Sequence, residues 1–238
     1  MSYSSAETAH DPIKTALLEA ILPHVAFDGW GDVAFDAAVG DSDIDPDAAR
    51  QTCPRGAVDL AMEFHKQGDI DMRAAMADHD LTDMRIRDKI SLAIRLRLQV
   101  CADKEAVRRG TILFAMPHLA AEGARLIWGT SDAIWTLLGD TSEDVNYYSK
   151  RATLSAVYSS VVLYWLGDDS LDGQATDAFI DRRIDNVMQF EKLKGHMRGN
   201  PLVKPFLGPL DALFGQVKAP NARTGVRDDV PGRWTDNK

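Results

Sequence analysis

Apolar residues recur at spacings of three and four along most of the chain, which is the spacing of amphipathic α-helices. The sequence shows no convincing strand alternation and no Asn-Gly hairpin turn. The pattern therefore predicts an all-α protein of about nine helices. At the start of the chain we expect three short helices, near 13–25, near 31–39 and from Asp45 and Pro46 onward, where Asp can cap and Pro suits the first helical position.

Breaks in the later helices are expected where proline, glycine or a capping residue interrupts the apolar pattern. Pro117 separates two helices. Ser131 can cap a further helix that ends at Gly139, and Thr141 can cap the next one. The other helices are expected over 54–66, 70–78, 81–102, 105–115, 117–128 and 175–194.

The helix that follows Thr141 is apolar on more than one face, since two stripes of apolar and aromatic residues run along it. A helix patterned in this way is either enclosed in the core or forms the wall of an apolar cavity. Aromatic residues at helical spacing serve in cores more often than in pockets, so both interpretations stay open. The candidates for the lining of a pocket are Trp128, Trp135, Tyr158, Val162 and Trp165.

The three short helices followed by longer ones have the order of a TetR-type helix-turn-helix domain joined to a helical ligand-binding part. In such a domain the third helix enters the major groove and presents cations and hydrogen-bond donors. Here its approach carries Asp41, Asp43, Asp45 and Asp47 against Arg50, and this charge opposes DNA binding. We therefore expect a TetR-like helical bundle whose helix-turn-helix part is degenerate.

The charge balance also opposes attraction to nucleic acid, because 27 basic and 36 acidic side chains leave a net charge of −9. One basic run contains Arg85, Arg87, Lys89, Arg95 and Arg97. It could contact phosphate, but its apolar positions favour an ordinary helix with a solvated face or a dimer contact. Cys53 and Cys101 match no paired spacing, which favours buried thiols in a reducing compartment.

Reactive constellations do not occur among the common sequence motifs. The chain has no GxSxG, HExxH, GxGxxG or GxxxxGK string, and no glutamate is followed three residues later by histidine. The sequence therefore predicts a protein that is not an enzyme and that needs no cofactor or metal. The N-terminus has the pattern of neither a secretory signal nor a mitochondrial presequence, and the longest apolar run is far too short to span a bilayer.

After Gly195 prolines and glycines become frequent, while apolar residues still keep a helical face. This segment can contact a membrane, and the alternative is that it docks on the protein's own core or stays irregular. The candidates for membrane contact are Leu202, Phe206, Leu210, Leu213 and Phe214. We divide the chain into a flexible N-terminus, a degenerate helix-turn-helix part, a helical lipid-binding part, an amphipathic segment and a disordered tail, over 1–11, 12–68, 69–195, 196–220 and 221–238.

Two strings carry a resemblance to a known family: WGTSDAIWTLLGDTSEDVNYYSKRATLSAVYSSVVLYWLGDDS and FIDRRIDNVMQFEK. They closely resemble the ubiquinone-biosynthesis accessory proteins, a TetR-like lipid-binding family, and the resemblance extends over the chain apart from its two tails. It implies a homodimer that binds an isoprenoid lipid in an apolar pocket and reaches the membrane through a C-terminal amphipathic helix. It also implies that the protein hands a quinone precursor to a di-iron hydroxylase.

The resemblance places the hydroxylase-docking surface near Asp168 and Asp169 and the start of the 175–190 helix. The family pattern has Trp after the Thr that matches Thr176, whereas this chain has Asp177. That exchange removes an aromatic side chain of the kind that often dominates an interface, and it puts docking through this position in question.

Together these observations predict a bacterial, cytoplasmic, non-catalytic accessory protein of ubiquinone synthesis, peripheral on the inner membrane, that binds a prenylated quinone precursor. The alternatives are a TetR-like ligand-responsive transcription regulator and an enzyme. Specific, salt-sensitive binding to promoter DNA would identify the regulator. Stoichiometric iron, or turnover without a partner, would identify the enzyme.

Overall fold

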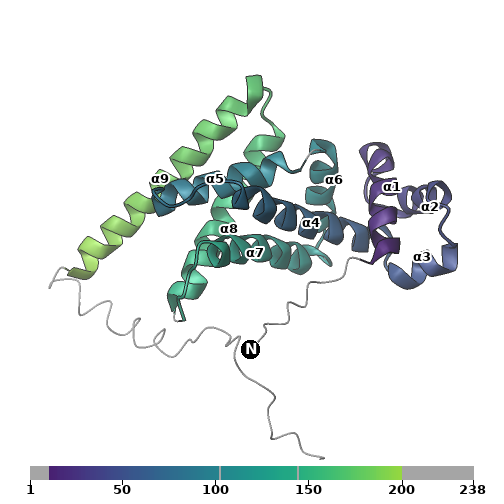
Figure 1. Ribbon diagram of the computed structural model, residues 1–238, viewed down its shortest axis with the longest axis horizontal. Helices are drawn as coiled ribbons and strands as arrows, with labels where there is room; N and C mark the ends of the chain where they lie inside the picture. The colour runs from purple at the N-terminus through teal and green to yellow at the C-terminus, as the bar shows by residue number, and fades with distance from the viewer. Residues whose placement is uncertain (1–10, 102, 144, 200–238) are drawn as a thin grey trace, which may run out of the picture.

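The computed structural model describes residues 11–101, 103–143 and 145–199, with side chains described as far as 187 and for 189. Within these residues the backbone forms nine α-helices and one short 3-10 helix, and no strand (Figure 1). The predicted all-α class is confirmed. The α-helices are α1 (Pro12–Asp28), α2 (Asp32–Asp41), α3 (Pro46–Thr52), α4 (Ala57–Ala77), α5 (Ile86–Gln99), α6 (Lys104–Phe114), α7 (Ala120–Leu137), α8 (Val145–Leu166) and α9 (Gln174–Gly199), and the 3-10 helix η1 (Leu171–Gly173) precedes α9.

Local capping chemistry starts α1 and α3 where the sequence predicts it. The Asp11 carboxylate accepts a hydrogen bond from the Ile13 amide at 2.9 Å. The Asp45 carboxylate accepts from the amides of Asp47 and Ala48, each at 3.0 Å. A proline follows each capping aspartate, at a position where the missing N–H costs no helical hydrogen bond. The three short N-terminal helices are therefore confirmed.

A first hydrophobic core holds α1–α3 together and includes the start of α4. Leu17, Ile21, Phe35 and Leu60 are fully buried in it. The Trp30 indole, which follows α1, donates to the Ala106 carbonyl at 3.0 Å and so connects this core to α6. In Figure 1 this unit occupies one end of the molecule, with α4 leading away from it.

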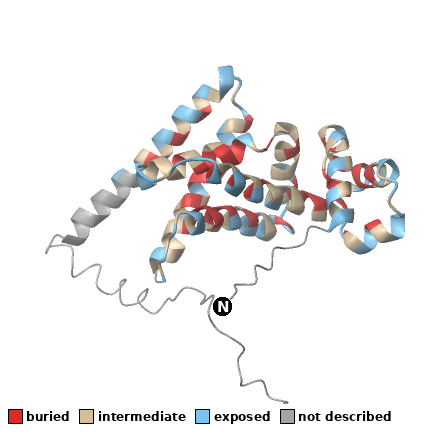
Figure 2. Cartoon of the chain, viewed as in Figure 1, coloured by how far each residue is buried: buried red, intermediate tan, exposed pale blue. Residues whose placement is uncertain are grey.

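A second hydrophobic core lies among α4, α5, α7, α8 and α9. It buries Met72, Ile94, Ile134 and Val161, and Figure 2 shows the buried positions along the inner faces of these helices. In α8, Leu154, Val157, Tyr158, Val161 and Val162 are all buried, and they point in more than one direction around the helix. The prediction that this helix is apolar on more than one face is confirmed.

Two predicted helix breaks are wrong. Residues 54–66 and 70–78 do not form two helices, because α4 runs without interruption from Ala57 to Ala77 through Gly68. Ser131 does not cap a helix, because it is buried inside α7. Its hydroxyl bonds to the Ile127 carbonyl at 3.2 Å and to the Ser155 hydroxyl at 2.9 Å. The place of Ser131 is thus explained by its contacts with other parts of the fold and not by local capping.

Other sequence expectations are met at this level. Gly139 follows α7 with a φ of 75°, the left-handed conformation that glycine adopts most readily at the end of a helix. Cys53 and Cys101 are both free and buried. None of the helices in the described part of the chain is long and apolar enough to cross a membrane. The five candidates for membrane contact, from Leu202 to Phe214, lie outside the described residues.

Candidate functional site

A cavity of about 270 Å³ that opens to the surface lies where the two hydrophobic cores meet. Trp30, Ala61 and Ala106 from the first core line one side. Tyr158 and Val162 from the second core line the other. The walls come from α4, α5, α6, α7 and α8, so the cavity depends on the packing of five helices rather than on a loop. A mostly apolar cavity built on rigid elements is the usual form of a small-molecule site.

Small residues on the helices around the cavity leave space between larger ones. On α6, Ala106 and Gly110 face the cavity beside Phe114. Gly123 on α7 comes so close to Phe114 that a Cβ at this position would lie 2.7 Å from the Cβ of Phe114. The helices can therefore approach one another at the ends of α6 and α7 while the middle of the cavity stays open.

The helix α6 is attached at both sides of the cavity. Its Arg108 guanidinium donates to the Leu166 carbonyl at 2.7 Å, and its Lys104 ammonium donates to the Asp168 carbonyl at 2.8 Å. On the opposite side, Arg109 donates to the Ala26 carbonyl at 3.0 Å. These bonds hold α6 over the cavity through the carbonyls at the ends of α8 and α1.

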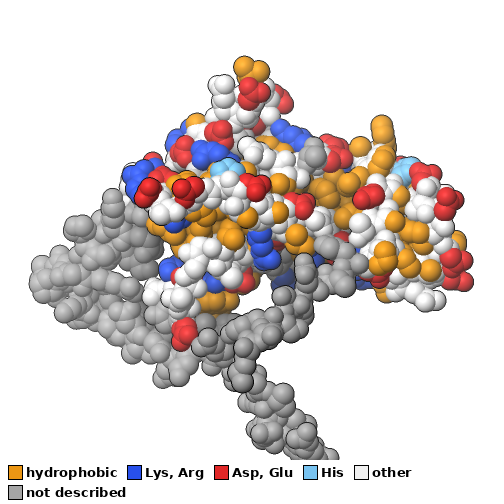
Figure 3. Space-filling model, viewed as in Figure 1, with side chains coloured by type: hydrophobic (Ala, Val, Ile, Leu, Met, Phe, Trp, Pro, Cys, Tyr) orange, Lys and Arg blue, Asp and Glu red, His pale blue; other side chains and the backbone are white. Residues whose placement is uncertain are grey.

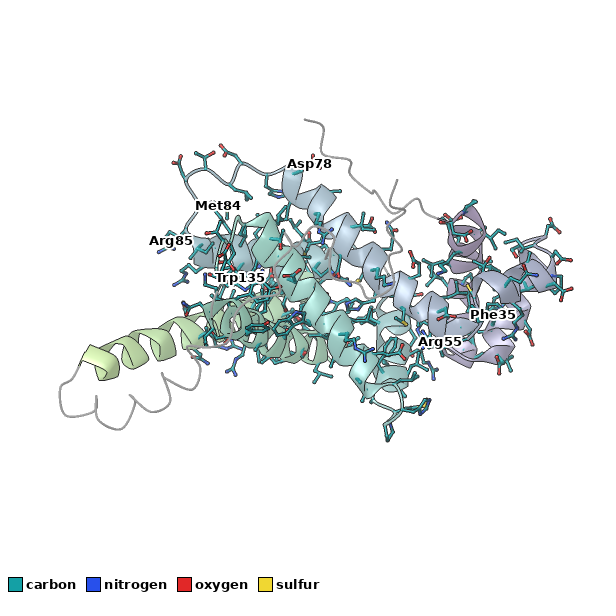
Figure 4. The ribbon with its side chains drawn as sticks, turned by 90° about the horizontal axis from the view of Figure 1, so that it is seen from below. Phe35, Arg55, Asp78, Met84, Arg85 and Trp135 are labelled. Atoms are coloured by element: carbon teal, nitrogen blue, oxygen red, sulfur yellow. The ribbon has the colours of Figure 1, made fainter. Side chains whose placement is uncertain are left out.

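The structure brings together three of the five residues predicted to line a pocket. Tyr158, Val162 and Trp165 line the cavity from successive turns of α8. Trp128 does not reach it and packs instead on Tyr148, with ring centroids 6.2 Å apart. The fifth residue, Trp135, lies elsewhere: in Figure 4 it is far from Phe35 and Arg55, at the other end of the helical body.

Trp135 lines a second cavity, also of about 270 Å³, among α5, α7, α8 and α9. Its indole donates to the Lys150 carbonyl at 3.2 Å, and the Lys150 ammonium lies 5.2 Å from the ring centroid. Ile90 and Val157 form part of the apolar wall. The predicted pocket residues therefore divide between two separate cavities.

One end of the first cavity is polar, and it centres on Arg97. This side chain is only 2% exposed, and its Nε donates to the Asp69 carboxylate at 2.8 Å. Its two terminal nitrogens donate to the Cys101 sulfur at 2.6 Å and to the His65 carbonyl at 2.8 Å. The buried Thr130 hydroxyl donates to the same Asp69 oxygen at 2.8 Å. The buried charges are thus paired and hydrogen-bonded, as a low-polarity interior requires.

The ionisable groups at this end are held in their neutral forms, apart from the Arg97–Asp69 pair. Burial, and then the nearby Arg97 charge, lower the pKa of His65 from 6.5 to about 4. Burial raises the pKa of the Cys101 thiol, although the Arg97 charge opposes this effect. Burial also raises the pKa of the Tyr158 hydroxyl well above its usual value. The polar end therefore carries no net charge near neutral pH.

The polar end is the part of the site that the sequence did not predict. Arg97 was expected on a solvated face or at a dimer contact, and that expectation is wrong for this residue because it is fully enclosed. The other four basic residues of the run, Arg85, Arg87, Lys89 and Arg95, are not fully buried. A usable signal was the spacing of four residues both between Arg97 and Cys101 and between His65 and Asp69.

The residues predicted for partner binding lie at the turn between α8 and α9, where Asp168 and Asp169 are found, and in the first turn of α9, which holds Asp177. Asp168 caps α9, and its carboxylate accepts bonds from the Ser170 amide at 2.9 Å, the Thr176 amide at 2.8 Å and the Thr176 hydroxyl. These bonds hold the pKa of Asp168 well below its usual range. Asp169 is exposed. The Asp177 carboxylate accepts from the Arg95 guanidinium at 2.7 Å and so joins α9 to α5.

Acidic side chains surround the third helix, as the sequence predicts. Arg50 on α3 pairs with Asp36 at 3.0 Å and with Asp32 at 3.5 Å, and its guanidinium lies 4.4 Å from the centroid of the Phe35 ring. The basic residue of α3 is therefore engaged within the domain. Figure 3 shows acidic groups over the surface at this end of the molecule.

Comparison with known proteins agrees with this architecture. Residues 120–191, which include α7, α8 and the first part of α9, match the model of the COQ9 family. The chain resembles the COQ9 proteins. The predicted resemblance to the ubiquinone-biosynthesis family is confirmed.

Two relatives extend the match beyond these helices. The chain is 28% identical over 193 residues to the "Probable ubiquinone biosynthesis protein coq9, mitochondrial" of Dictyostelium discoideum, which covers 76% of this chain and 62% of that protein. It is 25% identical over 219 residues to the human "Ubiquinone biosynthesis protein COQ9, mitochondrial", which covers 87% of this chain and 66% of that protein. The chain thus spans slightly less than two thirds of the length of these two relatives.

A solved structure shares the fold. The TetR transcriptional regulator from Nitrosomonas europaea superposes with a TM-score of 0.60 at 17% sequence identity, and covers 74% of this chain and 97% of that chain. The predicted TetR-like fold is confirmed by this likeness, which at such low identity concerns the fold alone.

Proposed function

We propose that this chain is a non-catalytic accessory protein of ubiquinone biosynthesis that binds a prenylated quinone precursor and presents it to a di-iron hydroxylase. The observation that carries the proposal is the first cavity, whose walls are mostly apolar and lie on five helices. The similarity to relatives named as ubiquinone biosynthesis proteins supports the choice of pathway. In this proposal the oxidation chemistry belongs to the hydroxylase, and the chain contributes binding and delivery.

An isoprenoid chain suits the apolar walls of this cavity. Each methylene group that moves from water into such a site contributes about 0.8 kcal/mol, so a few isoprene units suffice for useful affinity without a charged anchor. Leu163 is 61% exposed and Ala115 is also exposed, and both belong to the cavity lining. The cavity therefore has an edge at the surface through which a long chain can extend.

The proposal places the protein in the bacterial cytoplasm, peripheral on the inner membrane. Membrane contact is assigned to the segment with Leu202, Phe206, Leu210, Leu213 and Phe214. The proposal also assigns a homodimer. Hydroxylase docking is proposed at the turn with Asp168 and Asp169, next to Leu171, which is 76% exposed. Asp177 contributes to this surface mainly by fixing α9 on α5 through its pair with Arg95.

A reconstituted hydroxylation assay tests the proposal. The hydroxylase is mixed with vesicles that contain a prenylated quinone precursor, with and without the full chain. We expect the full chain to increase the rate of hydroxylation and to produce no product without the hydroxylase. Leu171→Asp should remove most of the increase, whereas the matched exposed change Val33→Asp, at the α2 end, should leave it intact. Product formation by the chain alone would instead identify an enzyme.

The alternative is a ligand-responsive transcription regulator, because the chain shares its fold with the TetR transcriptional regulator from Nitrosomonas europaea. The engagement of Arg50 by Asp32 and Asp36 disfavours it, because a recognition helix needs free cations and donors. A mobility-shift experiment with promoter DNA at low salt distinguishes the two functions. Specific binding that weakens steeply with salt would favour the regulator.

A further inference from the structure

The first cavity changes in character from its inner end to its surface edge. At the inner end, Arg97, Tyr158 and Cys101 are buried polar residues, and His65 is partly buried beside them. At the surface edge, Leu163 and Ala115 are apolar and exposed. A ligand that is polar at one end and apolar along the rest of its length matches this gradient in only one orientation.

The Tyr158 hydroxyl makes no hydrogen bond to any residue in the described part of the chain, although the side chain is only 3% exposed. Its oxygen is not among the fully buried side-chain atoms that lack a partner in the described residues, so it is open to the space beside it and can bond to a molecule there. Its ring lies on the cavity wall, 6.0 Å from the Arg97 guanidinium carbon. The hydroxyl can therefore donate to an acceptor atom placed at the inner end of the cavity.

Arg97 adds further donors at the same place. A guanidinium has five N–H groups, and the bonds to Asp69, Cys101 and the His65 carbonyl use three of them. Two N–H groups are left for a ligand. The remaining N–H groups of Arg97 and the Tyr158 hydroxyl suit ligand oxygens that accept hydrogen bonds.

The charge of the site selects among oxygen-bearing ligands. The positive charge of Arg97 is already matched by Asp69, and the remaining polar groups are His65, Cys101, Thr130 and Tyr158. A carboxylate at this position would bring an unpaired negative charge into the interior at high cost. A neutral carbonyl oxygen can accept the same donors without that cost.

Resting on the proposed function, we propose that the quinone ring of the ligand binds at the inner end, with a ring oxygen hydrogen-bonded to Tyr158 and Arg97. The prenyl chain then runs along α6 and α8 and leaves at Leu163 and Ala115. This orientation makes the site selective for a neutral oxygenated ring over a hydrocarbon or an anionic lipid of the same size. Tyr158 is thus a specificity-determining residue.

The test compares three ligands that share one chain: decylbenzoquinone, decylbenzene and decylbenzoate. Their dissociation constants for the full chain are measured by calorimetry, for the wild type, for Tyr158→Phe and for the matched control Tyr164→Phe. Tyr164 stacks on Phe179 at 4.2 Å between ring centroids and is not part of the cavity wall. Both variants remove one hydroxyl and keep the ring, so neither should disturb folding.

We expect wild type to prefer the quinone over the other two ligands. Tyr158→Phe should raise the dissociation constant of decylbenzoquinone about 3- to 10-fold, the usual effect of one hydrogen bond, and change that of decylbenzene less than about 2-fold. Tyr164→Phe should change neither. An equal effect of Tyr158→Phe on all ligands, no effect on the quinone, or tightest binding of the benzoate would overturn the inferred orientation. Failure of wild type to bind any of the three would overturn the proposed function as well.

Discussion

The guanidinium of Arg97 on α5 and the carboxylate of Asp69 on α4 form an ion pair at 2.8 Å inside the protein, with side chains only 2% and 13% exposed. These two residues are 28 positions apart in the sequence and connect the helices at the inner end of the cavity. The Thr130 hydroxyl extends the connection to α7. One buried polar cluster thus fixes the relative positions of three helices that line the cavity.

Removal of one partner of this pair should destabilise the protein strongly. We expect Asp69→Asn to lower the free energy of unfolding in urea by about 3 kcal/mol, because it leaves the Arg97 charge buried without a counter-ion. The matched control is Asp88→Asn, which breaks the exposed Arg85–Asp88 pair and should change little. The double variant Asp69→Leu with Arg97→Met should lose less free energy of unfolding than the sum of the losses of Asp69→Leu and Arg97→Met alone. Additive losses would show that the two charges do not stabilise each other.

Two glycines within helices should respond in opposite ways to alanine. A Cβ at Gly68 would collide with the Arg97 guanidinium, which is held in place by its three bonds. We expect Gly68→Ala to destabilise the protein by about 1–3 kcal/mol. Gly129 on α7 has no atom within 4 Å of the corresponding position, so Gly129→Ala should stabilise by about 0.5–1 kcal/mol through helix propensity. Thermal unfolding of the two variants measures both effects, and a shift in the same direction would contradict the prediction.

Stability should fall as the pH decreases from neutrality, owing in part to His65. In the folded state its pKa is lowered from 6.5 to about 4, so below pH 6.5 the unfolded chain binds a proton that the folded chain does not. The free energy of unfolding should therefore decrease from about pH 6.5 toward pH 4, by at most roughly 3 kcal/mol. Burial lowers the pKa of His65 most and the Arg97 charge lowers it further, whereas Asp69 and the Leu126 backbone raise it.

Urea unfolding at pH 6.5 and pH 5 measures this effect in a range above the titration of ordinary carboxylates. In the wild type the His65 Nε2 lies 2.9 Å from the Thr130 hydroxyl. His65→Gln keeps a group that can bond to this hydroxyl and should flatten the pH dependence of the free energy of unfolding. His118→Gln changes an exposed histidine and should keep the slope of the wild type. An unchanged slope in His65→Gln would mean that another group dominates.

The helices that could be predicted are those whose boundaries depend on local chemistry. The start of α3 follows from Asp45 and Pro46 alone, and the turn after α7 follows from Gly139. Local signals fail where a residue serves a distant contact. Separate helices were expected over 54–66 and 70–78, but Gly68 lies inside α4 and makes room for Arg97. Ser131 suggested a cap, but it bonds to Ser155 on α8.

The site was predictable in part for the same reason. Aromatic and apolar spacing along α8 pointed to Tyr158, Val162 and Trp165, because the helix carries all three to one cavity. The same spacing could not separate them from Trp128 and Trp135, whose positions depend on how α7 packs. Arg97 was expected on a solvated face or at a dimer contact, and its burial could not be predicted because its partner, Asp69, lies on another helix.

Filling the cavity should block binding without unfolding the protein. Ser159 lies on α8 at the cavity wall and is partly exposed, so Ser159→Phe should occupy the space of the ligand. We expect this variant to lose most of its affinity for decylbenzoquinone and to keep the helical circular-dichroism spectrum. Ser149→Phe, at the second cavity, is the matched control and should bind as the wild type does. Equal losses in the two variants would place the ligand outside the first cavity.

The central claim is that the first cavity binds a prenylated quinone precursor. The most direct measurement is organic extraction of the purified full chain, followed by identification and quantification of the released lipid by mass spectrometry, in parallel with Ser159→Phe. The account predicts a prenylated quinone or its precursor in near-stoichiometric amount with the wild type and a large loss with the variant. A wild-type protein without such a lipid, or equal amounts of lipid on both proteins, would contradict it.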